Sequence, residues 1–432
     1  MRTSLLLLAL ASATSFATAA NTDWNRFRGP NGSGTAATTG LPATFEKAQI
    51  GWMVSVPFGW SSPVPWGDKV ILTAETAADK RAVLCLSAAD GSKVWEYEVP
   101  FKEHRQHKFN SFASSTPFVD ADRIYITWTS GTDVQALALN HDGKLLWHRE
   151  GIANYVHEHG SGVSPVVADG VLIVRAEFAT EKKGTALAEP EQMDWKSQIV
   201  GLDAATGKDL WRREVPNTFN PYSTPTVRQT AAGAEFLVAN TTSGFMGLDV
   251  KTGKINWQHN PGYQQRSVGG IVLEGDTLFA CLGSGGGGKE SAILKVSASG
   301  PEEVAVIKDA PLPYVPSPLL VGDRLYLLND GGIFTAVKWP SGEPVYEPQR
   351  LSSAKGRSTK YFSSPVAADG KIFCCSQTGD VVTVKQGDAF EVLGVTELDA
   401  PINASPAISD DALYIRTEKS LYRINASGGK LP

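Results

Sequence analysis

A serine or threonine followed by proline recurs along the chain at nearly even spacing. The motif stands at Ser62-Pro63, Thr116-Pro117, Ser164-Pro165, Thr224-Pro225, Ser317-Pro318, Ser364-Pro365 and Ser405-Pro406. A degenerate copy fits at Gly269-Gly270, inside the one long gap. The eight copies have a mean period of about 49 residues, and a period of this size is typical of propellers and similar repeat arrays.

Each copy contains four short runs with β-strand patterning. In the third copy, VSPVVA turns at Asp169-Gly170 into VLIVRAE, and QIVGLDAATG later leads into KDLWRREV. Asp-Gly and Thr-Gly dipeptides between alternating apolar runs indicate β-hairpins. The repeats therefore predict an all-β chain, an eight-bladed β-propeller of four-stranded antiparallel blades.

The last copy, from Ser405 to about Ile424, contains only three such runs. Residues 50–56 (IGWMVSV) alternate like a strand and precede the first copy. Because an unpaired strand edge is a liability, we expect this N-terminal strand to close the ring against residues 412–424. The chain of 432 residues, long enough for two or three ordinary domains, then reads as a signal peptide (1–20), an N-terminal extension (21–49) and one propeller domain (50–432).

Four tryptophans follow a glycine turn at the same place in successive copies. They are Trp95, Trp147, Trp211 and Trp257. A large flat side chain at a fixed place in each sheet can pack on the neighbouring sheet and bury roughly 150–250 Å². We predict a structural role for all four.

Export is predicted from the first twenty residues. Arg2 is followed by the apolar run Leu5 to Ala11 and by the small residues Ala17-Thr18-Ala19, a pattern typical of a cleaved signal peptide. No other run is long and apolar enough to predict a transmembrane segment. The 40 basic and 45 acidic residues give no basic excess for nucleic acid. We expect a soluble monomer in the periplasm or outside the cell.

The four cysteines lie in strand-like runs. Cys85, Cys281, Cys374 and Cys375 fit the positions of small buried apolar residues. Neighbouring strand residues point to opposite faces, so a disulfide between Cys374 and Cys375 would distort the strand. The two interpretations are buried thiols, which we favour, and a vicinal disulfide.

The chain resembles a known family at several of these motifs. AADGSKVW and DAATGKDLW are similar to the tryptophan-docking repeats of PQQ-type β-propellers, and DWNRFRGPNGSG with GLPATF resembles the start of secreted bacterial PQQ-like, BamB-like proteins. The family includes quinoprotein dehydrogenases and the BamB scaffold of outer-membrane protein assembly, so the resemblance implies a fold rather than one function.

The dehydrogenase members imply PQQ with Ca²⁺ and a vicinal disulfide ring. In this chain the adjacent Cys374 and Cys375 lie late, in a strand-like run, and Cys375 occupies the place of Cys281 two copies earlier. The cysteine pair of this chain therefore differs from the disulfide of the dehydrogenases both in its position along the chain and in lying within a strand-like run. An envelope oxidoreductase dependent on PQQ or a metal is therefore the alternative hypothesis, and we expect no cofactor.

Six of the seven histidines fall between residues 104 and 159. Two pairs, His104 with His107 and His157 with His159, precede the first strands of the second and third copies. Equivalent loops of adjacent blades lie side by side, so the four imidazoles are candidate ligands for a transition metal. The alternative is that they are hydrogen-bonded residues framing a funnel.

The favoured function is a non-catalytic binding or scaffold module of the cell envelope. Loops around a central funnel would present polar and aromatic side chains to a protein, peptide or glycan partner. The candidate funnel residues are Asn110, Tyr155, Tyr222, Tyr263, Arg266, Tyr314 and Tyr361. No catalytic residues are predicted.

Overall fold

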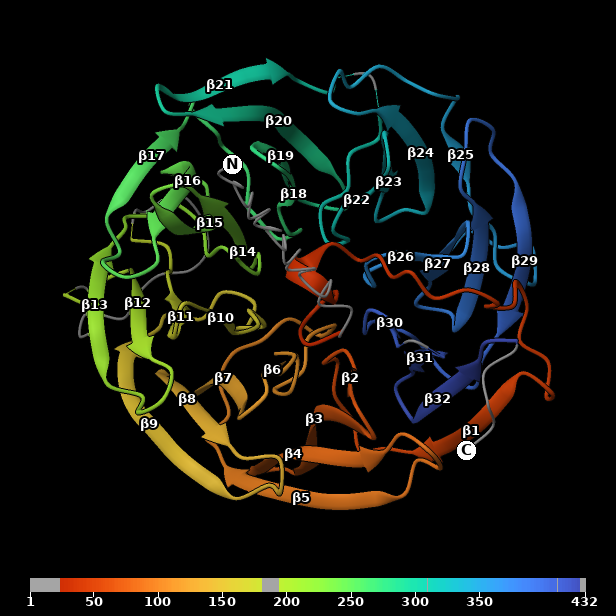
Figure 1. Ribbon diagram of the computed structural model, residues 1–432, viewed down its shortest axis with the longest axis horizontal. Coiled ribbons are helices and arrows are strands. Elements are labelled where there is room, and N and C mark those ends of the chain that lie inside the picture. Colours follow the sequence, from red (N-terminus) through yellow and green to blue (C-terminus); the bar gives the residue numbers. More distant parts are fainter. Residues whose placement is uncertain (1–23, 181–193, 309, 410, 428–432) are drawn as a thin grey trace, which may run out of the picture.

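A computed structural model describes residues 24–180, 194–308, 310–409 and 411–427, and the predicted signal peptide lies outside them. Eight four-stranded sheets stand around one axis (Figure 1). In seven of them the strand that comes first in the chain is innermost and the last lies at the circumference, and in the eighth the N-terminal strand is outermost. Every strand pair within the sheets is antiparallel. The predicted eight-bladed propeller is confirmed. None of the helices in the described part of the chain is long and apolar enough to cross a membrane.

The strand bounds follow the repeat. Blades 1 to 4 consist of β2 (Val64–Trp66), β3 (Lys69–Ala77), β4 (Lys80–Ser87), β5 (Lys93–Pro100); β6 (Phe118–Val119), β7 (Ile124–Ser130), β8 (Asp133–Leu139), β9 (Leu145–Asn154); β10 (Val166–Ala168), β11 (Val171–Ala176), β12 (Gln198–Asp203), β13 (Asp209–Glu214); β14 (Thr226–Thr230), β15 (Gly233–Asn240), β16 (Gly244–Asp249), β17 (Ile255–His259). Blades 5 to 7 consist of β18 (Val272–Glu274), β19 (Thr277–Gly283), β20 (Gly288–Ser297), β21 (Gly300–Ala305); β22 (Leu319–Val321), β23 (Arg324–Leu328), β24 (Ile333–Lys338), β25 (Gln349–Arg350); β26 (Val366–Ala368), β27 (Lys371–Cys375), β28 (Asp380–Lys385), β29 (Val392–Glu397).

Blade 8 closes the ring as predicted. It consists of β30 (Ala407–Ile408), β31 (Ala412–Arg416), β32 (Ser420–Asn425) and β1 (Ile50–Ser55). The N-terminal β1 pairs with β32 from Ile50 opposite Ile424 to Ser55 opposite Ser420. The buried Arg416 of β31 donates hydrogen bonds across the seam to the carbonyl oxygens of Ser61 (3.0 Å) and Thr73 (2.8 Å) in blade 1.

The hydrophobic core lies between the blades. One cluster joins Phe279 and Ile293 of blade 5 to Leu325 of blade 6. The adjacent Cys374 and Cys375 belong to different clusters, one shared with blade 6 and the other with blade 8. Both are buried free thiols, because successive side chains of β27 face opposite neighbours.

The repeated hydroxyl groups link the blades around the channel. At six of the eight junctions between neighbouring blades in the described part of the chain, the backbone amide of the residue at the repeat position donates a hydrogen bond to the side-chain hydroxyl at that position in the next blade. An example is Thr116 N to Ser164 Oγ (3.0 Å). The other five are Ser62 to Thr116, Ser164 to Thr224, Gly270 to Ser317, Ser317 to Ser364 and Ser364 to Ser405. In blade 5 the hydroxyl position is taken by Gly270, one residue later than the sequence motif at Gly269-Gly270 placed it, and this residue has no hydroxyl.

Tryptophans join the outer parts of neighbouring blades. The indole of Trp95 in β5 donates to the carbonyl of His141 in the next blade (3.0 Å), and its ring lies on Gly143. Trp52, Trp147 and Trp211 contact Gly91, Gly207 and Gly253 in the same way. Trp257 differs, since its indole donates to Glu235 of its own blade.

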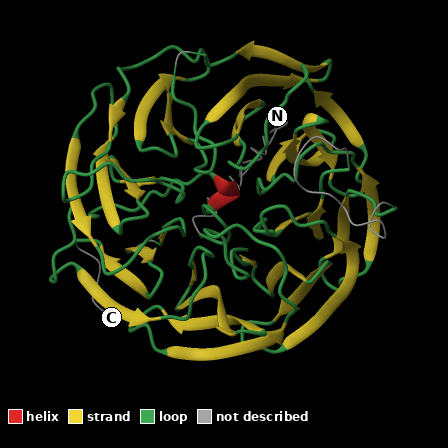
Figure 2. Ribbon diagram, turned by 180° about the vertical axis from the view of Figure 1, so that it is seen from behind, coloured by secondary structure: helices red, strands yellow, loops and turns green. Residues whose placement is uncertain are grey.

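The N-terminal extension passes through the centre of the ring. The short 3₁₀ turn η1 (Pro30–Gly32) lies at the middle of the disc in both views (Figures 1 and 2). Asn31 pairs with both backbone groups of Val227 in β14, and Gly34 and Ala36 bond Ala367 in β26. The segment therefore satisfies inner strand edges that would otherwise be unpaired.

The gap in the hydroxyl ring predicts a stabilising substitution. Gly270→Ser should raise the free energy of unfolding by about 1 kcal/mol over Gly270→Ala, because the new hydroxyl can accept from the Thr224 amide. A Cβ at this position meets nothing closer than Ser317 Oγ at 3.4 Å. Urea denaturation of both variants measures the difference. Equal stability of the two variants would contradict the prediction.

The tryptophan contact predicts a second difference. Gly143→Ala should cost about 2 kcal/mol more than Gly170→Ala, because the new Cβ of residue 143 would lie 2.6 Å from the Trp95 ring. Gly170 is a matched control: both glycines have φ of 76°, and a Cβ at Gly170 meets nothing within 4 Å. Thermal and urea unfolding should separate the variants, and equal losses would show that backbone strain alone is at work.

Candidate functional site

A cavity of about 590 Å³ occupies one end of the central channel. All eight blades contribute to its wall, mainly through the segments that precede their innermost strands. In every copy, the residue two positions before the repeat hydroxyl or its glycine substitute lines this cavity. These residues are Trp60, Ser114, Gly162, Tyr222, Val268, Val315, Phe362 and Asn403. The repeat hydroxyls of blades 2, 3, 4, 6, 7 and 8 also line it, as expected for alternate residues of extended segments.

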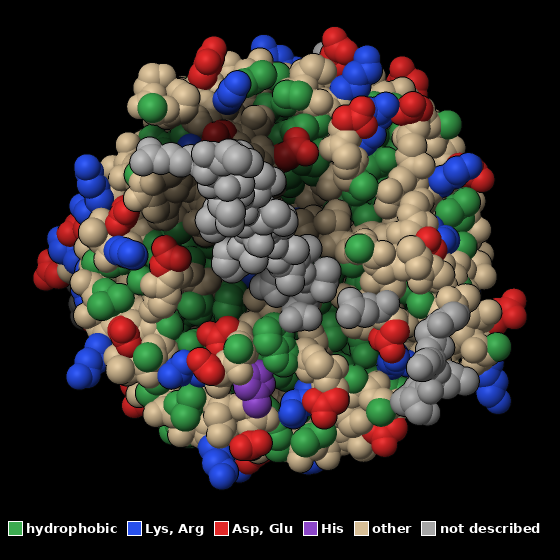
Figure 3. Space-filling view, viewed as in Figure 1, with side chains coloured by type: hydrophobic (Ala, Val, Ile, Leu, Met, Phe, Trp, Pro, Cys, Tyr) green, Lys and Arg blue, Asp and Glu red, His purple; other side chains and the backbone are tan. Residues whose placement is uncertain are grey.

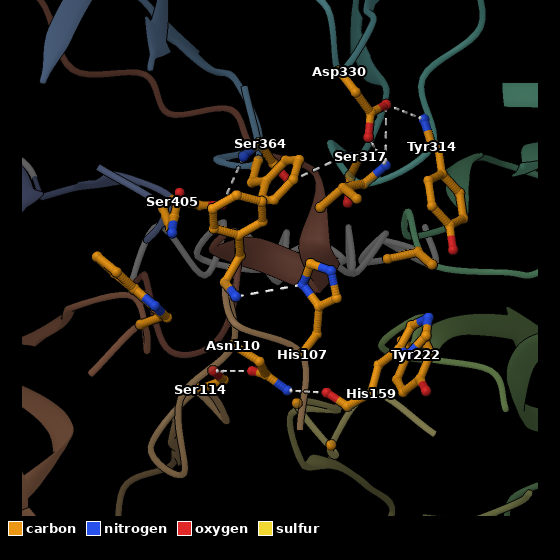
Figure 4. A pocket seen from close by; sticks show the side chains of 18 of the residues that line it. His107, Asn110, Ser114, His159, Tyr222, Tyr314, Ser317, Asp330, Ser364 and Ser405 are labelled. Carbon is orange, nitrogen blue, oxygen red and sulfur yellow. Dashed lines mark hydrogen bonds between the residues drawn. The ribbon is translucent and has the colours of Figure 1, made fainter. Parts of the chain in front are cut away.

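The N-terminal extension forms the floor of the cavity. Phe27 lines it, and the ribbon of this segment lies behind the side chains in Figure 4. Arg26 and Arg28, on either side of Phe27, are buried and donate to the carbonyls of Pro225 (2.6 Å) and Pro318 (2.8 Å). The cavity is thus closed at the end where the channel would otherwise continue.

His107, His159 and Asn110 stand together on the wall (Figure 4). The ring centroids of the two histidines are 5.5 Å apart. Asn110 Nδ2 donates to the His159 carbonyl (3.0 Å), and Asn110 Oδ1 accepts from Ser114 (2.6 Å). Burial lowers the pKa of His107, assisted by electrostatic repulsion from His159 and Lys108, so this imidazole is neutral at pH 7.

The other two histidines lie behind the wall. The rings of His104 and His157 stack with centroids 3.7 Å apart. His104 Nε2 bonds the hydroxyl of Thr129 (2.9 Å), and His157 Nε2 bonds the carbonyl of Gly131 (2.7 Å). Burial lowers the pKa of His104 to about 4, and burial together with His104 lowers that of His157 to about 3.

A buried ion pair supports the part of the wall next to His159. Arg266 bonds the carboxylate of Glu158 and donates to the hydroxyl of Tyr314 (3.2 Å). Tyr222 packs on His159 with parallel rings. Burial raises the pKa of both tyrosines, so their hydroxyls stay protonated.

The predicted funnel residues separate into two groups. Asn110, Tyr222, Arg266 and Tyr314 line the cavity. Tyr155, Tyr263 and Tyr361 lie in hydrophobic clusters between blades instead. For Tyr361 the reason is strand alternation, because its neighbour Phe362 takes the position that faces the cavity.

Sequence reasoning missed several cavity residues. Trp60, Phe362 and Asn403 could have been found by counting two residues back from each repeat hydroxyl. Asp330 and Lys360 gave no comparable signal. Asp330 accepts from the amides of Tyr314 (2.8 Å) and Val315 (3.2 Å); burial raises its pKa, and these hydrogen bonds partly oppose the rise.

The lining does not fit Ca²⁺ with PQQ. Ca²⁺ takes roughly six to eight oxygen ligands, with carboxylates prominent among them. Asp330 is the only carboxylate among the described residues that line the cavity. Nor does the described part of the chain place three or more His, Cys, Asp or Glu side chains as a metal-binding group. A transition metal on the four histidines stays a prediction.

The geometry defines an eight-bladed propeller with a cavity at one end of its central channel, and the comparisons give its family. The family described as outer membrane protein assembly factor BamB matches residues 43–188, 193–289 and 302–431, so the chain belongs to this PQQ-repeat family. A comparison with curated proteins gave no match.

Solved structures share the fold at low sequence identity. BamB from Moraxella catarrhalis is similar with a TM-score of 0.61 and 13% identity, over 87% of this chain and 98% of that one. The quinohemoprotein alcohol dehydrogenase ADHIIG from Pseudomonas putida HK5 gives 0.63 and 11%, over 95% and 81%. The computationally designed Ika8 protein gives 0.57 and 9%, over 87% and 99%. At these identities the likeness shows the fold alone.

The stacked histidines predict acid-sensitive stability. Their folded pKa values lie below the value of about 6.5 expected in the unfolded chain, so the unfolded state binds more protons between about pH 6.5 and 4. Their stabilisation is therefore present above pH 6.5 and decreases as the pH falls. From pH 7 to 5 the loss should be on the order of 2 kcal/mol per histidine.

Urea unfolding at pH 7 and 5 measures this loss. The double variant His104→Gln with His157→Gln keeps an amide donor near each ring's partner but does not titrate. It should lose clearly less stability on acidification than the unmodified protein. An equal loss would assign the acid sensitivity to other groups.

Proposed function

We propose that the protein is a non-catalytic binding module of the cell envelope, which takes its partner in the central cavity. The supporting observation is that each blade places a residue on this wall at one repeat position, while the N-terminal extension forms the floor. Such a concave site with aromatic surface and a few polar groups is typical of ligand recognition.

The envelope location rests on two observations. The sequence begins with a predicted signal peptide, and the chain belongs to a family named for outer membrane protein assembly. On the face shown in Figure 3, acidic and basic side chains are interspersed around the circumference. This distribution favours a protein, peptide or glycan partner over nucleic acid.

The alternative function, a PQQ-dependent oxidoreductase, has weaker support. The solved structures of similar fold include a quinohemoprotein alcohol dehydrogenase, but its similarity to this chain concerns the fold alone. Near the cavity, the Glu158 carboxylate already pairs with Arg266, and the Asp330 carboxylate already accepts two backbone amides. Both groups are engaged in holding the wall.

A cavity-filling variant tests the proposal. Gly162 lines the cavity, and a Cβ there meets Ser114 at 3.4 Å, so Gly162→Phe should fill space without reshaping the blade. The immobilised protein is exposed to envelope extract, and retained components are compared across variants. We expect the unmodified protein to retain at least one component, and the retained amount of that component to be at least tenfold lower with Gly162→Phe.

The control is Ala298→Phe, which adds the same ring at an exposed turn between β20 and β21. It should retain the partner fully. Purified protein is also titrated with PQQ and Ca²⁺ and assayed for dye-linked oxidation of alcohols and sugars. Stoichiometric PQQ binding with turnover, or retention unaffected by Gly162→Phe, would overturn the proposed function.

A further inference from the structure

The wall of the cavity offers aromatic surface from several directions. Phe27 comes from the floor, Trp60 and Tyr222 from blades 1 and 4, and Phe109 meets Phe362 across the channel with ring centroids 5.4 Å apart. Aromatic faces of this kind stack against the C–H faces of sugar rings as well as against other apolar groups.

Polar groups with free bonding capacity lie beside these rings. The ammonium of Lys360 and the amide Nδ2 of Asn403 line the cavity and have no hydrogen-bond partner among the described residues. Asp330 keeps lone pairs available on its carboxylate after accepting two backbone amides. These separate donors and acceptors suit a ligand that carries many hydroxyl groups.

Positive charge is concentrated beneath the floor. Arg26 and Arg28 are buried and donate to carbonyl oxygens, and no carboxylate in the described part of the chain accepts from them. Their acceptors, Pro225 and Pro318, directly follow the cavity-lining Thr224 and Ser317. Burial lowers the pKa of both arginines to about 9, so both stay charged at pH 7.

The charges on the wall itself largely balance. Arg266 forms an ion pair with Glu158, and Lys360 interacts electrostatically with the Asp330 carboxylate. The two buried guanidinium groups therefore leave the region with a net positive charge. In a cavity with low-dielectric walls such a charge attracts an anionic ligand.

The inner strand edges argue against an extended peptide. The backbone groups of Val227 and Ala367 are already paired with the N-terminal extension. Six repeat amides are bonded to hydroxyls of the next blade. A peptide would find few backbone partners, whereas a pyranose needs aromatic faces and side-chain hydrogen bonds.

We propose that the cavity binds a short acidic oligosaccharide, with its sugar rings against the aromatic wall and its carboxylate or sulfate drawn by the cations at the floor and Lys360. This inference rests on the proposed function and names the ligand class of the same site. The cavity volume lies within the roughly 300–1,000 Å³ usual for small-ligand pockets.

Isothermal titration calorimetry on the protein without its predicted signal peptide tests this inference. The probes are trigalacturonate for carboxylate, a carrageenan tetrasaccharide for sulfate, cellotriose and maltotriose as neutral sugars, and an N-acetylated tripeptide with a free carboxylate. At least one acidic sugar should bind at least tenfold more tightly than both neutral sugars. Raising the salt from 20 to 200 mM should weaken that binding severalfold, because the attraction is electrostatic.

Two variants assign the binding to the cavity. Lys360→Gln should weaken the acidic sugar at least tenfold and neutral sugars much less, because only the acidic sugar loses a charge interaction, and Lys360→Arg should restore much of the affinity. Lys355→Gln is the matched control, because Lys355 is exposed, lies in the same loop and pairs with Glu397 instead. Trp60→Ala should weaken all sugars.

Three outcomes would overturn the inference: no acidic sugar binding at 1 mM, neutral sugars binding as tightly as acidic ones, or binding by the tripeptide alone. Each is distinguishable from failure of the proposed function. If Gly162→Phe abolishes partner retention while the acidic sugars do not bind, the binding module stands and only its ligand class is wrong.

Discussion

Contact between neighbouring blades is the interaction on which this structure depends. A four-stranded sheet has two apolar faces, and here each face is buried mainly by the neighbouring sheet around the axis, with Leu41 and Phe45 of the N-terminal extension adding to one cluster. The clusters that join Phe279 to Leu325, and Cys374 to its neighbours in blade 6, contain residues of adjacent blades. The free energy gained by burying apolar surface, roughly 25 cal/mol per Å², is therefore available only in the assembled ring. Closure by β1 against β32 completes the last of these contacts.

Closure creates a second constraint at the axis, where eight inner strands would leave polar backbone groups unpaired. Two devices satisfy them. The repeat hydroxyls accept amide hydrogen bonds from the preceding blade, and the N-terminal extension bonds the edges of β14 and β26. Both also shape the cavity: the hydroxyl segments form its wall, and Phe27 its floor. The candidate site is thus a consequence of how the ring meets its hydrogen-bonding requirements.

The repeat made much of the fold predictable. Blade number, strand number, the closing strand and the opposite faces of Cys374 and Cys375 follow from local pattern, because strand periodicity and turn residues act over short distances. The site was only partly predictable. Phe362 and Tyr361 are adjacent aromatics, yet one faces the cavity and the other the core, and only their register relative to Ser364 distinguishes them.

An eight-bladed ring follows from the sequence alone, since a period of about 49 residues with four strands per period has few other ways to bury its apolar faces. The repeat also predicted that a serine or threonine, and in several blades a tryptophan, stands at the same place in successive blades. The tertiary structure was needed to show that residues 26–36 enter the channel, that two buried arginines lie beneath its cavity and that His104 and His157 stack behind the wall. Those arrangements depend on contacts between segments far apart in the chain, and no local pattern encodes such contacts.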